Sequence, residues 1–143
     1  MQPEVDVIQA LLRDSRTIAV VGLSSEPERP SHVVARYLQA HGYRIVPVNP
    51  KYAGSHILGE HCYPTLTLAN AALVDEGTPI DMVDCFRRPA HIAPIVEEAI
   101  AIGVHGIWMQ LGVVDQQAAD AARRAGIAVV MDRCMKIEHA RRP

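Results

Sequence analysis

Short runs of aliphatic and β-branched residues alternate along this chain with longer stretches whose apolar residues recur at helical spacing. The short runs predict strands at residues 18–21, 44–48, 80–85, 106–109 and 127–131, with a further short strand at 60–63. The longer stretches predict helices at residues 1–14, 31–41, 66–74, 89–102 and 116–125. Strands that alternate with helices are typical of an α/β protein. We therefore expect a Rossmann-like, doubly wound sheet of about five mainly parallel strands in three layers.

Breaker residues support these boundaries. Gly42, Gly103 and Gly126 each follow a helical stretch and can end it, and Asp115 can cap the helix that begins after it. Pro47 lies inside the second strand, which predicts that this strand is near its end there or has one side without a partner.

Composition narrows the class of protein. With 143 residues, 49% of them apolar and 4% aromatic, we expect a single domain spanning residues 1–143 with an aliphatic core. A net charge of −2 gives no reason to expect nucleic acid or an acidic membrane surface as a partner. No apolar run approaches the length of a membrane span, so we expect a cytoplasmic protein. The three cysteines are far apart, with no CxxC pair, and inert thiols are expected, while a reactive role for Cys134, near the ligand-binding edge, stays open.

In a parallel sheet the carboxyl ends of the strands meet at one edge, and ligands bind there beside the first strand. The residues after each strand are therefore the candidates: 22–25, 49–52, 86–88, 110–112 and 132–134.

The stretch TIAVVGLSSEPERPS, residues 17–31, is the most informative. A buried strand runs into Gly22, then a polar loop, then a helix beginning near Pro30 and Ser31. The first N–H groups of a helix lack partners and carry partial positive charge, which favours a bound anion. Arg29 adds a full positive charge, and the Ser31 hydroxyl can cap the helix or meet the anion. This loop predicts a phosphate site.

The type of nucleotide follows from what the two loops contain. An NAD site would show GxGxxG after the first strand and an acidic residue after the second. Here the first loop has a single glycine, and Asn49, Pro50 and Lys51 follow the second strand. The lysine would attract a phosphorylated ribose, so NADP or another ribose phosphate stays open while NAD is disfavoured. No GKS or GKT sequence is present, which excludes a P-loop.

Five segments in this order resemble the small single-domain CoA-binding proteins of bacteria: VVGLSSEPERPSHVVARYL, PVNPKY, VDCFRRP, WMQLG and VVMDRCMKIEH. These proteins are similar to the N-terminal CoA-binding domain of the succinyl-CoA synthetase alpha subunit. The resemblance extends from about residue 15 to residue 139.

The resemblance implies that coenzyme A, free or as an acyl-CoA, lies across the strand ends. It places the phosphates on the 22–31 loop, the adenosine on residues 49–51, and residues after the third and fourth strands on the flanks. The implied binding residues are Gly22, Leu23, Ser24, Ser25, Arg29, Ser31, Asn49, Pro50, Lys51, Phe86, Arg87, Gln110 and Gly112.

The resemblance implies binding rather than catalysis, because the chain lacks the second domain and the histidine that the synthetase uses. No HExxH, HxxxH or GxSxG pattern assigns a metal or a nucleophile, so no catalytic residue is predicted. The alternative is an enzyme, either an NADP-dependent reductase or a CoA-handling subunit that lacks its partner. A homodimer or an unidentified protein partner stays open.

Overall fold

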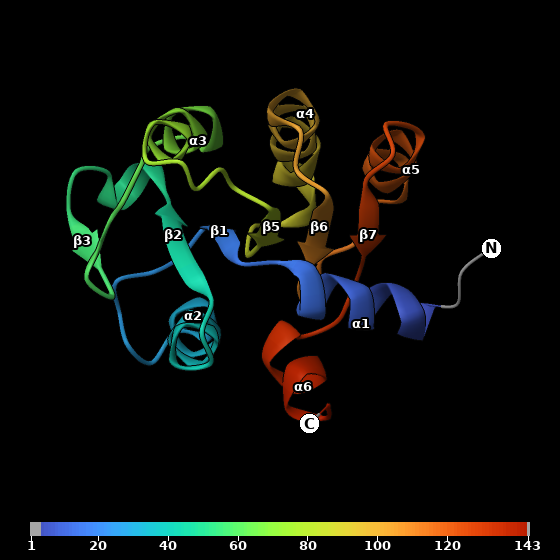
Figure 1. The fold of residues 1–143 in the computed structure, drawn as a ribbon, viewed down its shortest axis with the longest axis horizontal. Helices are drawn as coiled ribbons and strands as arrows, with labels where there is room; N and C mark the ends of the chain where they lie inside the picture. The colour runs from blue at the N-terminus through green and yellow to red at the C-terminus, as the bar shows by residue number, and fades with distance from the viewer. Residues whose placement is uncertain (1–3, 143) are drawn as a thin grey trace.

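The computed structural model describes residues 4–142 and contains the expected parallel sheet. Its five strands lie in the order β2-β1-β5-β6-β7, and every neighbouring pair is parallel (Figure 1). The strands are β1 (Thr17–Val21), β2 (Arg44–Val48), β5 (Met82–Cys85), β6 (Gly106–Met109) and β7 (Ala128–Val130). The predicted α/β class and the Rossmann-like sheet are confirmed.

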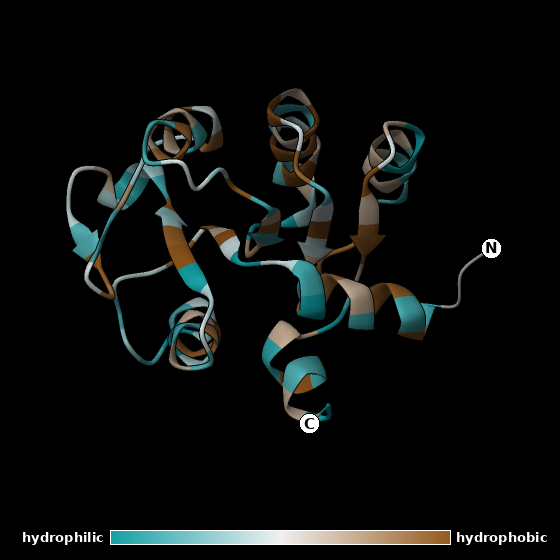
Figure 2. Cartoon of the chain, in the orientation of Figure 1, coloured by the Kyte–Doolittle hydropathy of each residue, from teal (hydrophilic) through white to brown (hydrophobic). Residues whose placement is uncertain are grey.

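Helices cover both faces of the sheet and make three layers (Figure 1). One face carries α3 (Leu66–Asp75), α4 (Ile92–Ile102) and α5 (Gln116–Arg124), and the other carries α1 (Glu4–Asp14), α2 (Pro30–Ala40) and α6 (Met135–Ala140). Each face has its own apolar cluster, because successive strand residues point to opposite sides. Apolar residues accordingly run along the strands, whereas the helices mix polar and apolar positions (Figure 2).

Several boundaries differ from expectation. The strand expected at 60–63 is β4 (Glu60–His61), which pairs antiparallel with β3 (His56–Ile57), and Tyr63 forms a separate bridge to Val48. The helix expected from residue 89 begins as a 3-10 turn at Pro89–His91, and a second 3-10 turn spans Pro50–Tyr52. The first three residues of the helix expected at 1–14 lie outside the described residues. The helix α6 was not expected, since six residues are too few to show a period.

The position of β2 at the edge of the sheet accommodates Pro47, as expected. This proline has no N–H to donate, and its carbonyl accepts a hydrogen bond from the Tyr63 N–H at 3.0 Å. The strand is therefore paired on its outer side only by a short bridge, which the missing donor permits.

The strand ends that matter for function are level with one another. Val21 is the register partner of both Val48 and Cys85, and Cys85 is the partner of Met109. The chain moves outward from β1 to β2 and then returns to the other side of β1 at β5, so the winding direction reverses between β1 and β5. The loops that follow these strands thus meet at a topological switch point, where α/β sheets bind ligands.

Asp84 in β5 is a buried carboxylic acid with 0% exposure, and neither of its oxygens has a hydrogen-bond partner among the described residues. Burial raises the pKa of this group well above its ordinary value of 3.8. Above pH 4 the unfolded chain therefore loses this proton while the folded chain retains it, so stability falls as the pH rises toward the folded-state pKa.

We expect Asp84→Asn to remove this pH dependence. Relative to the parent, the variant should gain unfolding free energy with rising pH, by up to about 1.4 kcal/mol per pH unit within that window. Urea unfolding at pH 5 and pH 8 measures the difference. Asp75→Asn, at the exposed end of α3, serves as the control and should show little change at either pH. If the unfolding free energies of the Asp84 variant and the parent differed by the same amount at both pH values, the raised pKa of Asp84 would be contradicted.

Candidate functional site

The loops after β1, β2 and β5 enclose a cavity of about 360 Å³, here called the loop pocket. It is lined by Gly22, Ser24, Glu26, Arg29, Pro30, Ser31, Asn49, Lys51, Tyr52 and Phe86. The cavity lies at the switch point because the three strands end at the same level.

Gly22 allows the first loop to pass close to the end of β5. Its φ is +91°, a conformation that glycine adopts without strain, and its N–H donates to the Val48 carbonyl at 2.8 Å. A Cβ at this position would lie 2.6 Å from the Phe86 carbonyl oxygen. Any other residue would therefore push the loop away from β5 and change the cavity.

Serine and histidine side chains fix the loop onto α2. The N-cap residue of α2 is Arg29, whose side chain makes no capping hydrogen bond, so Ser31 is not the cap. Instead the Ser31 hydroxyl accepts from the Ser24 N–H at 3.0 Å, and His32 Nδ1 donates to the Ser24 carbonyl at 2.9 Å. No side chain of the N-cap residue covers the free N–H groups of the first helical turn, which therefore stay available to an anion.

Asn49 connects the two loops that form the floor of the loop pocket. Its Nδ2 donates to the Leu23 carbonyl at 3.1 Å, and its Oδ1 accepts from the Lys51 N–H at 3.0 Å. An aspartate could not make the first of these bonds. The neutral amide therefore has a structural reason, and the position carries no negative charge toward a ligand.

The charged groups of the loop pocket are two cations and one carboxylate. Arg29 Nε lies 3.0 Å from Glu26 Oε2, and both side chains are exposed. Lys51 Nζ lies 5.3 Å from the centre of the Tyr52 ring. Hydrogen bonding with the hydroxyls of Ser24 and Ser25 lowers the pKa of Tyr52. The pocket is therefore positive on balance, with one internal carboxylate that competes for Arg29.

A second cavity, of about 520 Å³, extends from the loop pocket along the strand ends and is here called the apolar pocket. It is lined by Pro30, Val34, Phe86, Arg87, Arg88, Pro89, Gln110, Leu111, Gly112, Val113 and Cys134. Pro30 and Phe86 line both cavities, so the two are adjacent across these side chains. Together they form one elongated site, in which the loop pocket carries Arg29 and Lys51 and the apolar pocket also includes Arg87 and Arg88.

Most of the residues that the sequence singled out line this combined site. The exceptions are Leu23, whose side chain is buried in the core, and Ser25 and Pro50, which lie on the same loops but line neither cavity. The sequence analysis did not name Glu26, and it included Tyr52 only in the candidate range 49–52, not among the implied binding residues. Glu26 lies in the phosphate loop itself, three residues before Arg29, and this spacing was the available signal for an ion pair.

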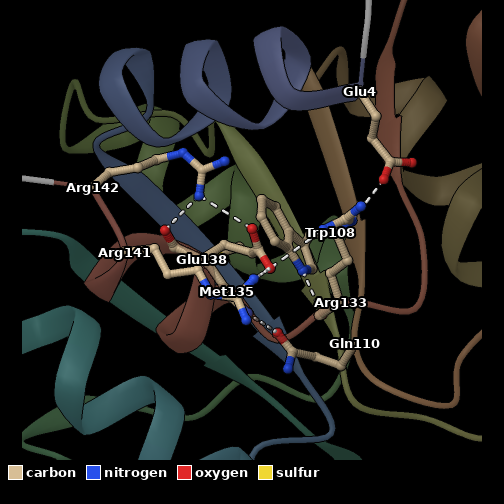
Figure 3. A network of polar contacts seen from close by, with 8 residues as sticks. All are labelled: Glu4, Trp108, Gln110, Arg133, Met135, Glu138, Arg141 and Arg142. Atoms are coloured by element: carbon tan, nitrogen blue, oxygen red, sulfur yellow. Dashed lines mark hydrogen bonds and ion pairs between the residues drawn. The ribbon is translucent and has the colours of Figure 1, made fainter.

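Gln110 supports the neighbouring helix as well as the cavity. Its Oε1 accepts from the Met135 N–H at 3.1 Å, at the first turn of α6 (Figure 3). The buried Glu138 in α6 pairs with Arg133, Arg141 and Arg142, and Trp108 Nε1 donates to the Arg133 carbonyl at 2.8 Å. The bonds of Trp108 and Gln110 join the start of α6 to the end of β6, and Cys134, just before the helix, lines the apolar pocket.

The parallel sheet with helices on both faces defines an α/β protein with a Rossmann-like fold. The chain belongs to the family described as the CoA binding domain, whose profile matches residues 16–140.

Similar proteins span nearly the same length. The Bacillus subtilis (strain 168) protein YneT is 36% identical over 138 residues, which cover 96% of each chain. The structure of cell-free ID.343 from Thermus thermophilus has a TM-score of 0.85 at 36% identity, covering 99% of this chain and 98% of that one. A protein from Pyrococcus horikoshii OT3 has a TM-score of 0.84 at 37% identity, covering 96% and 90%. Within residues 4–142, every helix is too short or too polar to cross a membrane.

We expect Gly22→Ala to destabilise the fold by about 1–3 kcal/mol, because it adds both left-handed strain and the clash with the Phe86 carbonyl. Gly54→Ala is the matched control, since Gly54 has a φ of +88° with open space around its Cβ position. The control substitution should lower the unfolding free energy by only about 1 kcal/mol. Urea unfolding compares the two variants, and equal losses would show that the close approach to Phe86 has no energetic weight.

Proposed function

We propose that this protein binds coenzyme A, free or acylated, along the carboxyl edge of its sheet and acts without catalysis of its own. The observation that carries the proposal is the cationic loop pocket at the switch point, in a chain of the CoA-binding family. The loop of residues 22–31 would hold the diphosphate, with the free N–H groups of α2 and Arg29 as donors.

The positive charge of Lys51 favours a ligand whose ribose carries a phosphate over a ligand whose ribose has only hydroxyl groups. It follows β2, where dinucleotide-binding proteins that use NAD carry a carboxylate for the ribose hydroxyls. A cation at this point favours the 3′-phosphate that distinguishes coenzyme A from its dephospho form. Tyr52, beside Lys51, offers a ring on which the adenine could stack.

The absence of an activated nucleophile supports binding without catalysis. Within residues 4–142, no hydrogen bond joins a hydroxyl or thiol that lines the two pockets to a histidine or a carboxylate side chain. Nucleophilic catalysis needs such a pair. We therefore propose a protein that holds or reports coenzyme A, located in the cytoplasm, where this cofactor is handled.

Calorimetric titration of three ligands tests the proposal. Lys51→Ala should lower the affinity for coenzyme A by about tenfold and change the affinity for dephospho-CoA little, because only coenzyme A has the 3′-phosphate. Arg29→Ala should lower the affinity for both ligands by about tenfold and leave the affinity for adenosine unchanged. Equal losses for all three ligands, or tighter binding of NADPH than of coenzyme A by the parent protein, would overturn the assignment.

A substitution of Glu26 should raise the affinity for coenzyme A, whereas the two substitutions above should lower it. Because its carboxylate pairs with Arg29 and lines the loop pocket, Glu26→Gln should strengthen coenzyme A binding by about two- to fivefold at low salt. Glu28→Gln, in the same exposed loop but outside the pocket lining, is the matched control. The same calorimetry at low and high salt measures both. A gain of the same size in the two variants would point to net charge alone.

A further inference from the structure

A further cavity, of about 330 Å³, lies at the edge of the sheet opposite the loop pocket and is here called the arginine pocket. It lies at that edge because its walls are the end of α1, the residue that precedes β2, and the end of α6. The residues that line it are Gln9, Leu12, Arg13, Tyr43, His139 and Arg142. The arginine pocket therefore shares no residue with the loop pocket or the apolar pocket.

The polar groups of the arginine pocket are mostly hydrogen-bond donors. Two guanidinium groups, an imidazole, an amide and a phenol line it, and within residues 4–142 no carboxylate does so. The Tyr43 hydroxyl is satisfied, because it donates to the Leu12 carbonyl. His139 Nδ1 lies 2.9 Å from the Tyr37 hydroxyl, and Nε2 of the same ring has no partner within the described chain. A cavity with several donors and no carboxylate favours a bound anion.

Arg142 offers the donors best suited to an oxyanion. Its side chain is 22% exposed, and only Nη1 is engaged, at 2.6 Å from the Glu138 carbonyl oxygen and 3.1 Å from Glu138 Oε1 (Figure 3). Its Nε and Nη2 make no hydrogen bond to any of residues 4–142. These two nitrogens form an edge of the guanidinium that can hold a carboxylate or a phosphate through two parallel hydrogen bonds. Glu138 thus fixes one side of the group, and the paired donors stay available to a ligand.

The surroundings of the arginine pocket are positively charged, although the whole chain has a net charge of −2. Residues 133–142 include four lysines or arginines and one carboxylate, that of Glu138. Three arginines pair with Glu138, and only one of the three has a second carboxylate partner. On the α1 side, Arg13 pairs with Asp14, and both side chains are exposed, so this ion pair is weak and Arg13 can turn toward a ligand.

We infer that the arginine pocket is a second ligand site, which takes a small organic molecule bearing a phosphate group. A phosphate monoester has three terminal oxygens and a charge of about −1.5 to −2 at pH 7, so it uses more of these donors than a carboxylate does. The cavity is larger than a phosphate group, and the buried Leu12 and Tyr43 add apolar and aromatic surface for an organic part. The inference is independent of the proposed function, because the two sites lie at opposite edges of the sheet.

Titration of the ¹⁵N-labelled full-length protein with phenyl phosphate, followed by NMR, tests the inference. The Nε–H signal of Arg142 and the side-chain amide signals of Gln9 should shift. Phenyl phosphate should bind there about fivefold more tightly than inorganic phosphate, because only phenyl phosphate has a ring to pack in the cavity. Shifts confined to Gly22 and Ser24 would place phosphate at the loop pocket alone and overturn the inference, and equal affinities of the two probes would overturn the assignment of an organic ligand.

Substitutions at Gln9 test the electrostatics of the arginine pocket without disturbing the fold. Gln9 is exposed, and its side chain makes no hydrogen bond within the described chain, so Gln9→Glu adds a carboxylate to the cavity wall at little cost in stability. Gln9→Glu should lower the affinity for phenyl phosphate by about tenfold, whereas Gln9→Ala should lower it by about threefold at most. Equal affinities of these two variants would contradict the site.

Arg142→Gln supplies the complementary test. It should lower the affinity for phenyl phosphate by about tenfold or more, because it removes the paired donors and a positive charge. Arg124→Gln, at the exposed end of α5 on the other face of the sheet, removes the same charge elsewhere and should leave the affinity unchanged. Equal losses in the two variants would assign the effect to net charge and overturn the role of Arg142.

Discussion

The close approach of the first loop to the end of β5 is the constraint on which the site depends. The Gly22 N–H donates to the Val48 carbonyl on one side, and on the other side there is no room for a Cβ against Phe86. This one residue therefore brings the ends of β1, β2 and β5 together. Ser31, His32 and Asn49 then fix the loop that Gly22 has placed. The backbone and the short side chains of the cavity wall therefore have defined partners, which holds their donors in place before a ligand arrives.

Positive charge extends along the whole site. Arg29 and Lys51 lie around the loop pocket, and Arg87 and Arg88 line the far side of Phe86 together with apolar side chains such as Val34 and Leu111. Both halves of the site therefore attract a negatively charged ligand, and the second half also offers apolar surface to its uncharged groups. Glu26 reduces this field by pairing with Arg29, so the binding strength of the loop reflects a balance between opposite charges.

The sequence predicted the parts that follow from local patterns. The strand, glycine and proline between residues 17 and 31 predicted the loop, and the lysine at 51 predicted a site without an acidic clamp. It could not predict how side chains pair across elements, as in the bond from the Ser24 N–H to the Ser31 hydroxyl and the bond from Asn49 to the Leu23 carbonyl. The helix α6 was missed because its stability comes from Gln110 and the arginines around Glu138. Asp84 is visible in the sequence as an acid within an apolar strand, but its complete burial without a partner follows only from the packing around β5.

The helix α6 has one more consequence. The helix lies outside the strand pairing and is joined to the sheet by side-chain contacts, so a displacement of its six residues would leave every strand pair intact. Because Cys134 precedes it directly, such a shift would widen the cavity at its apolar end only. Under the proposed function, the loop pocket that would hold the nucleotide is therefore separate from the space that would hold an acyl group, so acyl groups of different size would leave the loop pocket unchanged.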